Sequence, residues 1–146
     1  MKKIINGSIY NTETARKIGA FEHSNRRSFD YFVETLFQTR AGKYFLHGEG
    51  GPNSRYAKLI DNASFSGGER IVPFTADEAK GWAEDGLDPD LYIAEFGEPE
   101  EASDEKKVIS ASIASDVYNA LQRAKANTGK PMGELIEQAC KNAYMR

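Results

Sequence analysis

The last forty residues of the chain combine one strand pattern with two helix patterns, and this combination constrains the fold most. Apolar and polar residues alternate over 108–113, which predicts a strand with two different faces. Residues 114–116 begin a helix with an apolar stripe, Gly129 ends it, and Lys130 and Pro131 lead into a second striped helix. A lone short strand has unpaired edges, so the pattern predicts that two copies pair as an antiparallel ribbon and share a four-helix core. Dimeric ribbons of this kind can enter the major groove of DNA.

The predicted dimer core consists of the apolar residues that share one side of the strand and of the two helices. It comprises Ile109, Ala111, Ile113, Val117, Leu121, Leu135, Ile136 and Ala139. Cys140 lies on the same stripe, and the chain has no second cysteine for an internal disulfide or a metal cluster. A buried structural thiol is therefore expected at this position.

The run 113–121, followed by Ala124, Gly129 and the run 133–136, resembles the ribbon-helix-helix family. The spacing matches without a gap over 106–146. This resemblance implies a homodimer that binds double-stranded DNA. The bases would be read by the outward residues of the ribbon, which here are Val108, Ser110 and Ser112.

The same resemblance implies a phosphate site at the start of the second helix, where free backbone N–H groups are available. The phosphate-binding residues in this chain would be Lys107, Lys130, Met132 and Gly133.

Three departures from the family pattern bear on DNA reading. Ala114 replaces the usual proline, and the ribbon carries two serines and a valine, although serine discriminates poorly between bases. Pro131 stands where a serine or threonine cap is expected, and it removes one N–H group from the phosphate clamp. The alternative is a dimerisation module of the same fold that does not read DNA.

Charge divides the chain into two parts. Residues 1–105 carry 12 basic and 19 acidic side chains, a net of −7, whereas residues 106–146 carry 7 basic and 3 acidic ones, a net of +4. Such asymmetry indicates different partners for the two halves, and a basic end suits DNA phosphates. We predict an α+β protein with a small domain over 1–87, an acidic short helix and linker over 88–105, and the ribbon-helix-helix domain over 106–146.

Residues 1–87 predict a small antiparallel sheet with helices on one face. Asn6 and Gly7 are typical of a tight turn, and a short helix carrying Ala15, Ile18 and Phe21 is expected next. Strands are expected over 29–39, 44–47 and 70–74, with a loop over 48–54 and a helix that begins with a capping box at 75–78.

Residues 2–7, 10–15 and 45–51 resemble a small domain found in proteins of Gram-positive plasmids, integrative elements and phages. Some of these proteins are associated with anti-CRISPR loci. The resemblance implies a mobile genetic element, such as a phage, as the source of the chain, and it supplies no catalytic residues.

Ten acids lie between Trp82 and Glu105, and no lysine or arginine interrupts them. Residues 88–96 are expected to form a short helix within this stretch. One interpretation is a self-repelling spacer between two domains. The other is a surface that mimics DNA and docks on a host CRISPR nuclease or its guide complex, as an anti-CRISPR inhibitor would. The candidate docking acids are Glu84, Asp85, Asp88, Asp90 and Glu95.

The residues predict no enzyme, no cofactor and no metal site. His47 and Glu49 could ligate a metal, but two ligands two residues apart are a weak signal, and a histidine at a strand end is the favoured interpretation. No stretch is long and apolar enough for a membrane helix, and no signal peptide is recognised. We therefore expect a cytoplasmic transcription regulator in a bacterial host cell.

Overall fold

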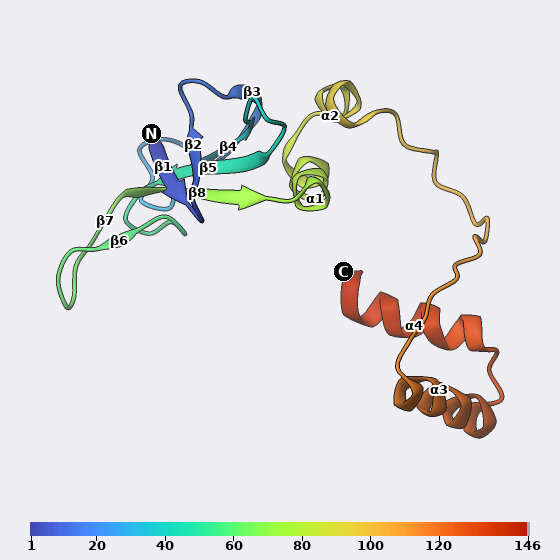
Figure 1. Ribbon diagram of the computed structural model, residues 1–146. Coiled ribbons are helices and arrows are strands. Elements are labelled where there is room, and N and C mark those ends of the chain that lie inside the picture. The colour runs from blue at the N-terminus through green and yellow to red at the C-terminus, as the bar shows by residue number, and fades with distance from the viewer. Residues whose placement is uncertain (146) are drawn as a thin grey trace. The chain divides into compact units, whose positions relative to one another are not determined.

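The computed structural model describes residues 1–145 and divides the chain into two compact units, Met1–Glu101 and Ala102–Arg146 (Figure 1). The fold is mixed α+β, with antiparallel sheets and four helices among the described residues. The strands are β1 (Lys2–Ile5), β2 (Ser8–Asn11), β3 (Arg16–His23), β4 (Phe32–Gln38), β5 (Tyr44–Gly50), β6 (Lys58–Leu59), β7 (Phe65–Ser66) and β8 (Gly68–Phe74). The helices are α1 (Ala76–Gly86), α2 (Pro89–Phe96), α3 (Ser115–Thr128) and α4 (Met132–Tyr144).

The main sheet of the first unit has the strand order β3-β4-β5-β8, and all of its pairs are antiparallel. Two separate hairpins, β1-β2 and β6-β7, accompany it. Asn6 and Gly7 connect β1 to β2 with φ angles of 50° and 77°, so the tight turn expected from this dipeptide is confirmed.

The two faces of the main sheet are covered by different elements. On one face, Leu36 and Leu46 are buried against Ala79 of α1. On the other face, Phe37, Phe45 and Ile71 form a second buried cluster, against which residues of the β1-β2 hairpin pack. The sheet is therefore the middle layer between helices and a hairpin.

Both helices of the first unit begin at N-cap residues that the sequence indicates, Thr75 and Asp88. The Thr75 hydroxyl accepts from the backbone N–H of Glu78, and the Glu78 carboxylate accepts from the N–H of Thr75, both at 3.1 Å, which confirms the capping box. The Asp88 carboxylate accepts from the N–H of Asp90 at 2.9 Å and begins α2. Phe96 packs against the core of the sheet, so the first unit includes α2, which we expected beside the linker.

The short helix predicted after residue 11 is wrong, because Arg16–His23 forms strand β3. The register of β3 against β4 shifts between Lys17 and Gly19, where the strand has a bulge. Ile18 packs with the core on the helix side, and Phe21 pairs with Glu34, whose side chain contacts α1 on that same side. Because of the bulge, Ile18 and Phe21 face the same side of the sheet although they are three residues apart. The same spacing is typical of two residues on one face of a helix, which explains the wrong prediction.

Two further boundaries differ from the prediction. Strand β4 begins at Phe32 rather than at residue 29. The predicted loop over 48–54 is wrong in its first part, since β5 continues to Gly50. Glycine is required in that part: a Cβ atom added at Gly48 would lie 1.9 Å from Cζ of Tyr56.

In the second unit, α3 and α4 occupy the predicted positions, and Gly129 ends α3 with a φ of 70°. Residues 97–114 form neither helix nor strand in the described chain, so the strand expected over 108–113 is not formed. The physical reason is that a strand needs a hydrogen-bonded neighbour, and the single chain offers none here. No helix among residues 1–145 is long and apolar enough to span a membrane.

Candidate functional site

The predicted dimer core of the second unit is largely open to solvent in the single chain. The exposed fractions of Ile109, Ile113, Val117 and Ile136 are 83%, 50%, 49% and 41%. Ala111 and Ala139 are also exposed, and only Leu121 and Leu135 are half-buried. None of residues 102–145 is buried, so this unit has no closed core of its own.

Helices α3 and α4 contact each other along one edge of their apolar stripes. Leu121 and Ala124 of α3 and Met132 and Leu135 of α4 are half-buried. Cys140 is exposed, so the expectation of a buried thiol is wrong for the single chain. Nothing within the described chain covers the part of α4 that carries this residue.

The residues predicted to contact DNA lie on exposed backbone and at the start of α4. Val108 is fully exposed, at 100%, and Ser110 and Ser112 are exposed beside it. Lys107 and Lys130 are exposed as well. The described chain therefore leaves the proposed base-reading positions and both of these basic side chains accessible.

The first turn of α4 has unsatisfied backbone donors. Pro131 is its N-cap and makes no side-chain hydrogen bond to the N–H groups of the turn. Nothing lies within 4 Å of a Cβ atom added at Gly133, so the side of the turn to which this atom would point is open. Such a helix start can bind an anionic oxygen.

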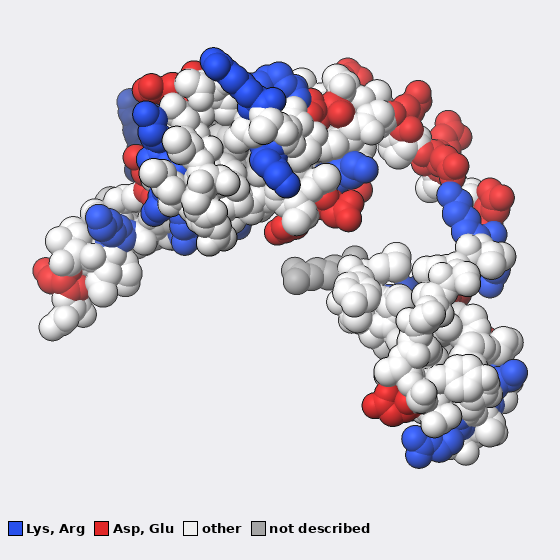
Figure 2. All heavy atoms as spheres, viewed as in Figure 1, with Lys and Arg blue, Asp and Glu red and all other residues white. Residues whose placement is uncertain are grey.

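Four of the five candidate docking acids are exposed, and the fifth is already paired. Glu84, Asp85, Asp88 and Asp90 face solvent. Glu95 has only 11% of its side chain exposed and forms an ion pair with an arginine of β3. Figure 2 shows further Asp and Glu side chains along the segment that follows α2.

A buried carboxylate organises the helix side of the sheet. Glu34 is 4% exposed and accepts hydrogen bonds from the Tyr56 hydroxyl and the Trp82 indole, both at 2.7 Å. Arg55 adds a third donor at 3.2 Å. Burial, together with the hydrogen bond to Glu34, raises the pKa of Tyr56 well above its ordinary value. These satisfied contacts indicate a structural role for the cluster.

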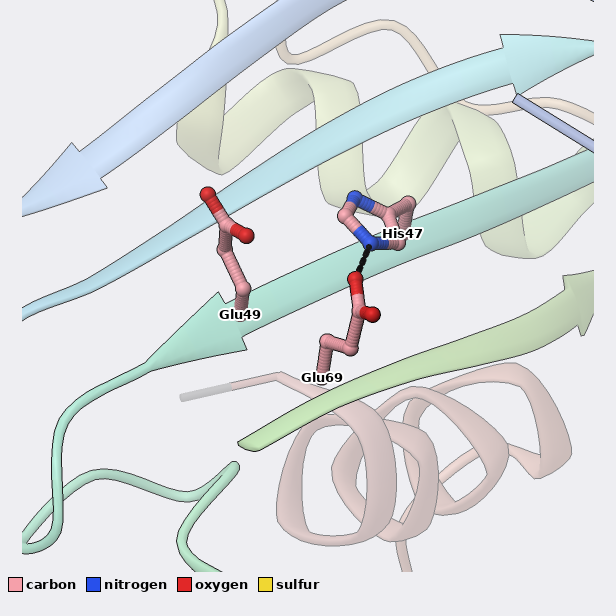
Figure 3. A group of neighbouring side chains, drawn as sticks. All are labelled: His47, Glu49 and Glu69. Atoms are coloured by element: carbon pink, nitrogen blue, oxygen red, sulfur yellow. Dashed lines mark hydrogen bonds and ion pairs between the residues drawn. The ribbon is translucent and has the colours of Figure 1, made fainter. Parts of the chain in front are cut away.

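The opposite side of the sheet carries a cluster of three side chains, and the sequence spacing indicates only two of them. His47 and Glu49 lie two residues apart on β5, and Glu69 on β8 is the register partner of Glu49 (Figure 3). One ligand-capable atom from each of the three side chains lies within 4.8 Å of the others. Glu69 was missed because only the pairing of β5 with β8 brings it to this position.

Comparisons with known proteins add one finding. No family model matches the chain, and no solved structure matches it. The chain is similar to the uncharacterized protein E-51 of Sulfolobus spindle-shape virus 1, with 54% identity over 35 residues. The matched segment is 24% of this chain and 69% of the viral protein.

Proposed function

We propose that this chain, which belongs through a segment of 35 residues to the family of the uncharacterized protein E-51, is a homodimeric DNA-binding protein of a mobile genetic element. It would be a non-enzymatic autoregulator that binds DNA through a ribbon-helix-helix domain over 106–146. The viral source of the relative supports the mobile-element part of the proposal. The second unit supports the remainder.

The observation that carries the proposal is the exposure of the apolar residues in the second unit. Leaving apolar residues such as Ile109 and Ile113 open to water is unfavourable, at about 25 cal/mol for each Å² of apolar surface. Within residues 102–145 nothing buries them. A second copy of the chain would pair 108–113 as a ribbon and cover the stripes of α3 and α4.

Pairing of two copies would also place the other face of each strand outward. Val108, Ser110 and Ser112 would then form the surface that enters the major groove. The serine hydroxyls can donate or accept hydrogen bonds to base edges, while the valine offers an apolar contact to a thymine methyl group. This surface favours modest discrimination between sequences.

Contacts to the DNA backbone would come from the start of α4 and from the basic side chains. The open N–H groups of Met132 and Gly133 would hold one phosphate, and Lys107 and Lys130 would add charge. The net charge of +4 over 106–146 doubles in a dimer. Binding should therefore weaken as the salt concentration rises.

The experiment that tests the proposal is a gel shift and footprint of the full-length protein on the DNA upstream of its own gene, over a salt series. We expect protection of two half-sites, as a two-fold symmetric dimer requires. The variant with Ser110→Ala and Ser112→Ala should bind this DNA more weakly while keeping the same oligomeric state. Equal affinity of the double variant and the parent for the protected DNA would contradict the base-reading assignment.

A second candidate function is inhibition of a host CRISPR nuclease by the acidic first half, with the second unit serving for dimerisation or autorepression. The exposure of Glu84, Asp85, Asp88 and Asp90 favours it, because a protein that binds in a nucleic-acid channel needs negative charge on its surface. The test is nuclease cleavage in the presence of the full chain and of a variant with these four acids changed to Asn or Gln. Inhibition that persists undiminished in the variant would exclude this surface.

A further inference from the structure

On β5 and β8, the sheet face opposite the helices carries a cluster of one imidazole nitrogen ligand and two carboxylates. His47 and Glu49 point to the same face because side chains alternate along a strand, and Gly48 between them faces Tyr56 on the helix side. Glu69 lies directly across from Glu49 on β8. Figure 3 shows the three side chains on this one face.

The distances within the cluster suit a single ion. His47 Nε2 lies 2.8 Å from Glu69 Oε2, and the three ligand-capable atoms lie within 4.8 Å of one another. Bonds of about 2.1 Å to one metal ion place its ligand atoms roughly 3–3.5 Å apart. His47 and Glu69, which now share a hydrogen bond, would have to move slightly apart, and rotation of the exposed glutamate side chains would bring all three atoms into this range.

The two strands hold the imidazole more firmly than the carboxylates. The side chain of His47 is only 16% exposed, whereas that of Glu69 is 49% exposed. A preorganised nitrogen ligand beside carboxylates that can adjust is a favourable arrangement for metal binding, since less side-chain freedom is lost.

The two carboxylates of the cluster, Glu49 and Glu69, give it negative charge that a bound cation would neutralise. Like charges directly opposite each other on neighbouring antiparallel strands are destabilising, and Glu49 and Glu69 occupy such positions. Within residues 1–145, Glu49 has no hydrogen bond or ion pair through its carboxylate. Lys58 lines an open depression beside Glu49 and Glu69, and among residues 1–145 it forms no ion pair with either glutamate.

We propose that His47, Glu49 and Glu69 bind one divalent transition-metal ion of the zinc class. An imidazole nitrogen with two carboxylate oxygens suits Zn²⁺, whereas Mg²⁺ and Ca²⁺ favour all-oxygen ligand sets. Glu49 and Glu69 line an open depression together with Tyr31, Lys58 and Gly68. The three ligands leave at least one position of a four-coordinate ion open. Water would complete the coordination there.

The test is titration calorimetry of the full chain with zinc chloride. All proteins carry Cys140→Ala, because the exposed thiol is itself a zinc ligand. We expect saturable binding of about one ion per chain, weakened at least about tenfold by either His47→Ala or Glu49→Gln. Glu49→Gln changes an exposed side chain with no partner in the described chain, so it tests the site without disturbing the fold.

The matched control is His23→Ala. His23 also lies beside a carboxylate, with Nε2 3.5 Å from Asp30 Oδ2, but it has no third ligand among the described residues. This variant should bind zinc as the parent does, and zinc should raise the thermal midpoint of both but not of His47→Ala. Absence of saturable binding, or an equal loss in His23→Ala and His47→Ala, would overturn the proposal.

Discussion

Arg16 of β3 and Glu95 of α2 form a bidentate ion pair, although they lie 79 residues apart in the sequence. The guanidinium Nη1 donates to Oε2 at 2.8 Å, and Nη2 donates to Oε1 at 2.7 Å. The Tyr44 hydroxyl donates to the same carboxylate at 2.9 Å. These bonds attach α2 to the sheet, and the hydrogen bonds from Arg16 lower the pKa of Glu95 although burial opposes this.

Glu95→Gln should therefore reduce stability in a pH-dependent way. The pKa of Glu95 in the folded protein lies below its ordinary value of 4.5, so the stabilisation is fully present above pH 4.5 and is lost as the pH falls through the folded pKa. Because 55% of the Arg16 side chain is exposed, we expect a loss of only about 1 kcal/mol in the free energy of unfolding near neutral pH.

The measurement for this variant is urea unfolding followed by the fluorescence of Trp82, the single tryptophan, at neutral pH and in acid. Glu98→Gln in the segment after α2 is the control, and it should unfold as the parent does. A loss of the same size at both pH values would contradict the assigned ion pair.

The parts of the fold that local residues determine could be predicted from the sequence. Thr75, Asp88 and Gly129 mark helix ends by their own hydrogen bonds or backbone angles, and all three were recognised. Strand β3 was mistaken for a helix because the bulge beside Ile18 depends on its pairing with β4. Pairing between distant segments is not visible in the spacing of a single segment.

The candidate sites likewise depend on pairing between segments that are distant in the sequence. Glu69 lies 22 residues from His47, and only the register of two strands brings them together. For the expected strand over 108–113, the pairing partner would not lie in the same chain at all but in another copy of it. A single chain therefore leaves this strand unformed, and the ribbon stays a prediction.

Gly48→Ala should destabilise the first unit. The new methyl group would lie 1.9 Å from Cζ of Tyr56, whose hydroxyl is held by Glu34 at 2.7 Å and cannot shift freely. We expect a cost of about 1–3 kcal/mol, typical of overpacking. Gly81→Ala in α1 is the control: nothing lies within 4 Å of its Cβ atom, and alanine should stabilise the helix by about 1 kcal/mol. In thermal unfolding, the midpoint of Gly48→Ala should lie below that of the parent and the midpoint of Gly81→Ala above it. Equal midpoints for the two variants would contradict this account.

Tyr56→Phe should weaken the buried cluster without changing the shape of the ring. The tyrosine is 6% exposed, and its hydroxyl is one of the three donors to the Glu34 carboxylate. Loss of this donor leaves a buried charge less well satisfied, at a cost of about 1–3 kcal/mol. Tyr144→Phe removes a hydroxyl from a side chain that is 85% exposed and should have little effect. Chemical denaturation compares the two, and similar free energies of unfolding would argue against the role of the Tyr56 hydroxyl.

Leu135→Asp tests the proposed dimer most directly. Leu135 is half-buried between α3 and α4, on the stripe that a second copy would cover. A carboxylate there has no partner in the apolar interface, and its burial without one costs on the order of several kcal/mol in each chain. We therefore expect the full-length variant to become a monomer or to lose helix in the second unit, as measured by sedimentation and far-UV circular dichroism. Gln138→Asp adds the same charge to an exposed position of α4 and should remain dimeric. A Leu135→Asp dimer as stable as this control would mean that the apolar stripe is not the surface through which two chains associate.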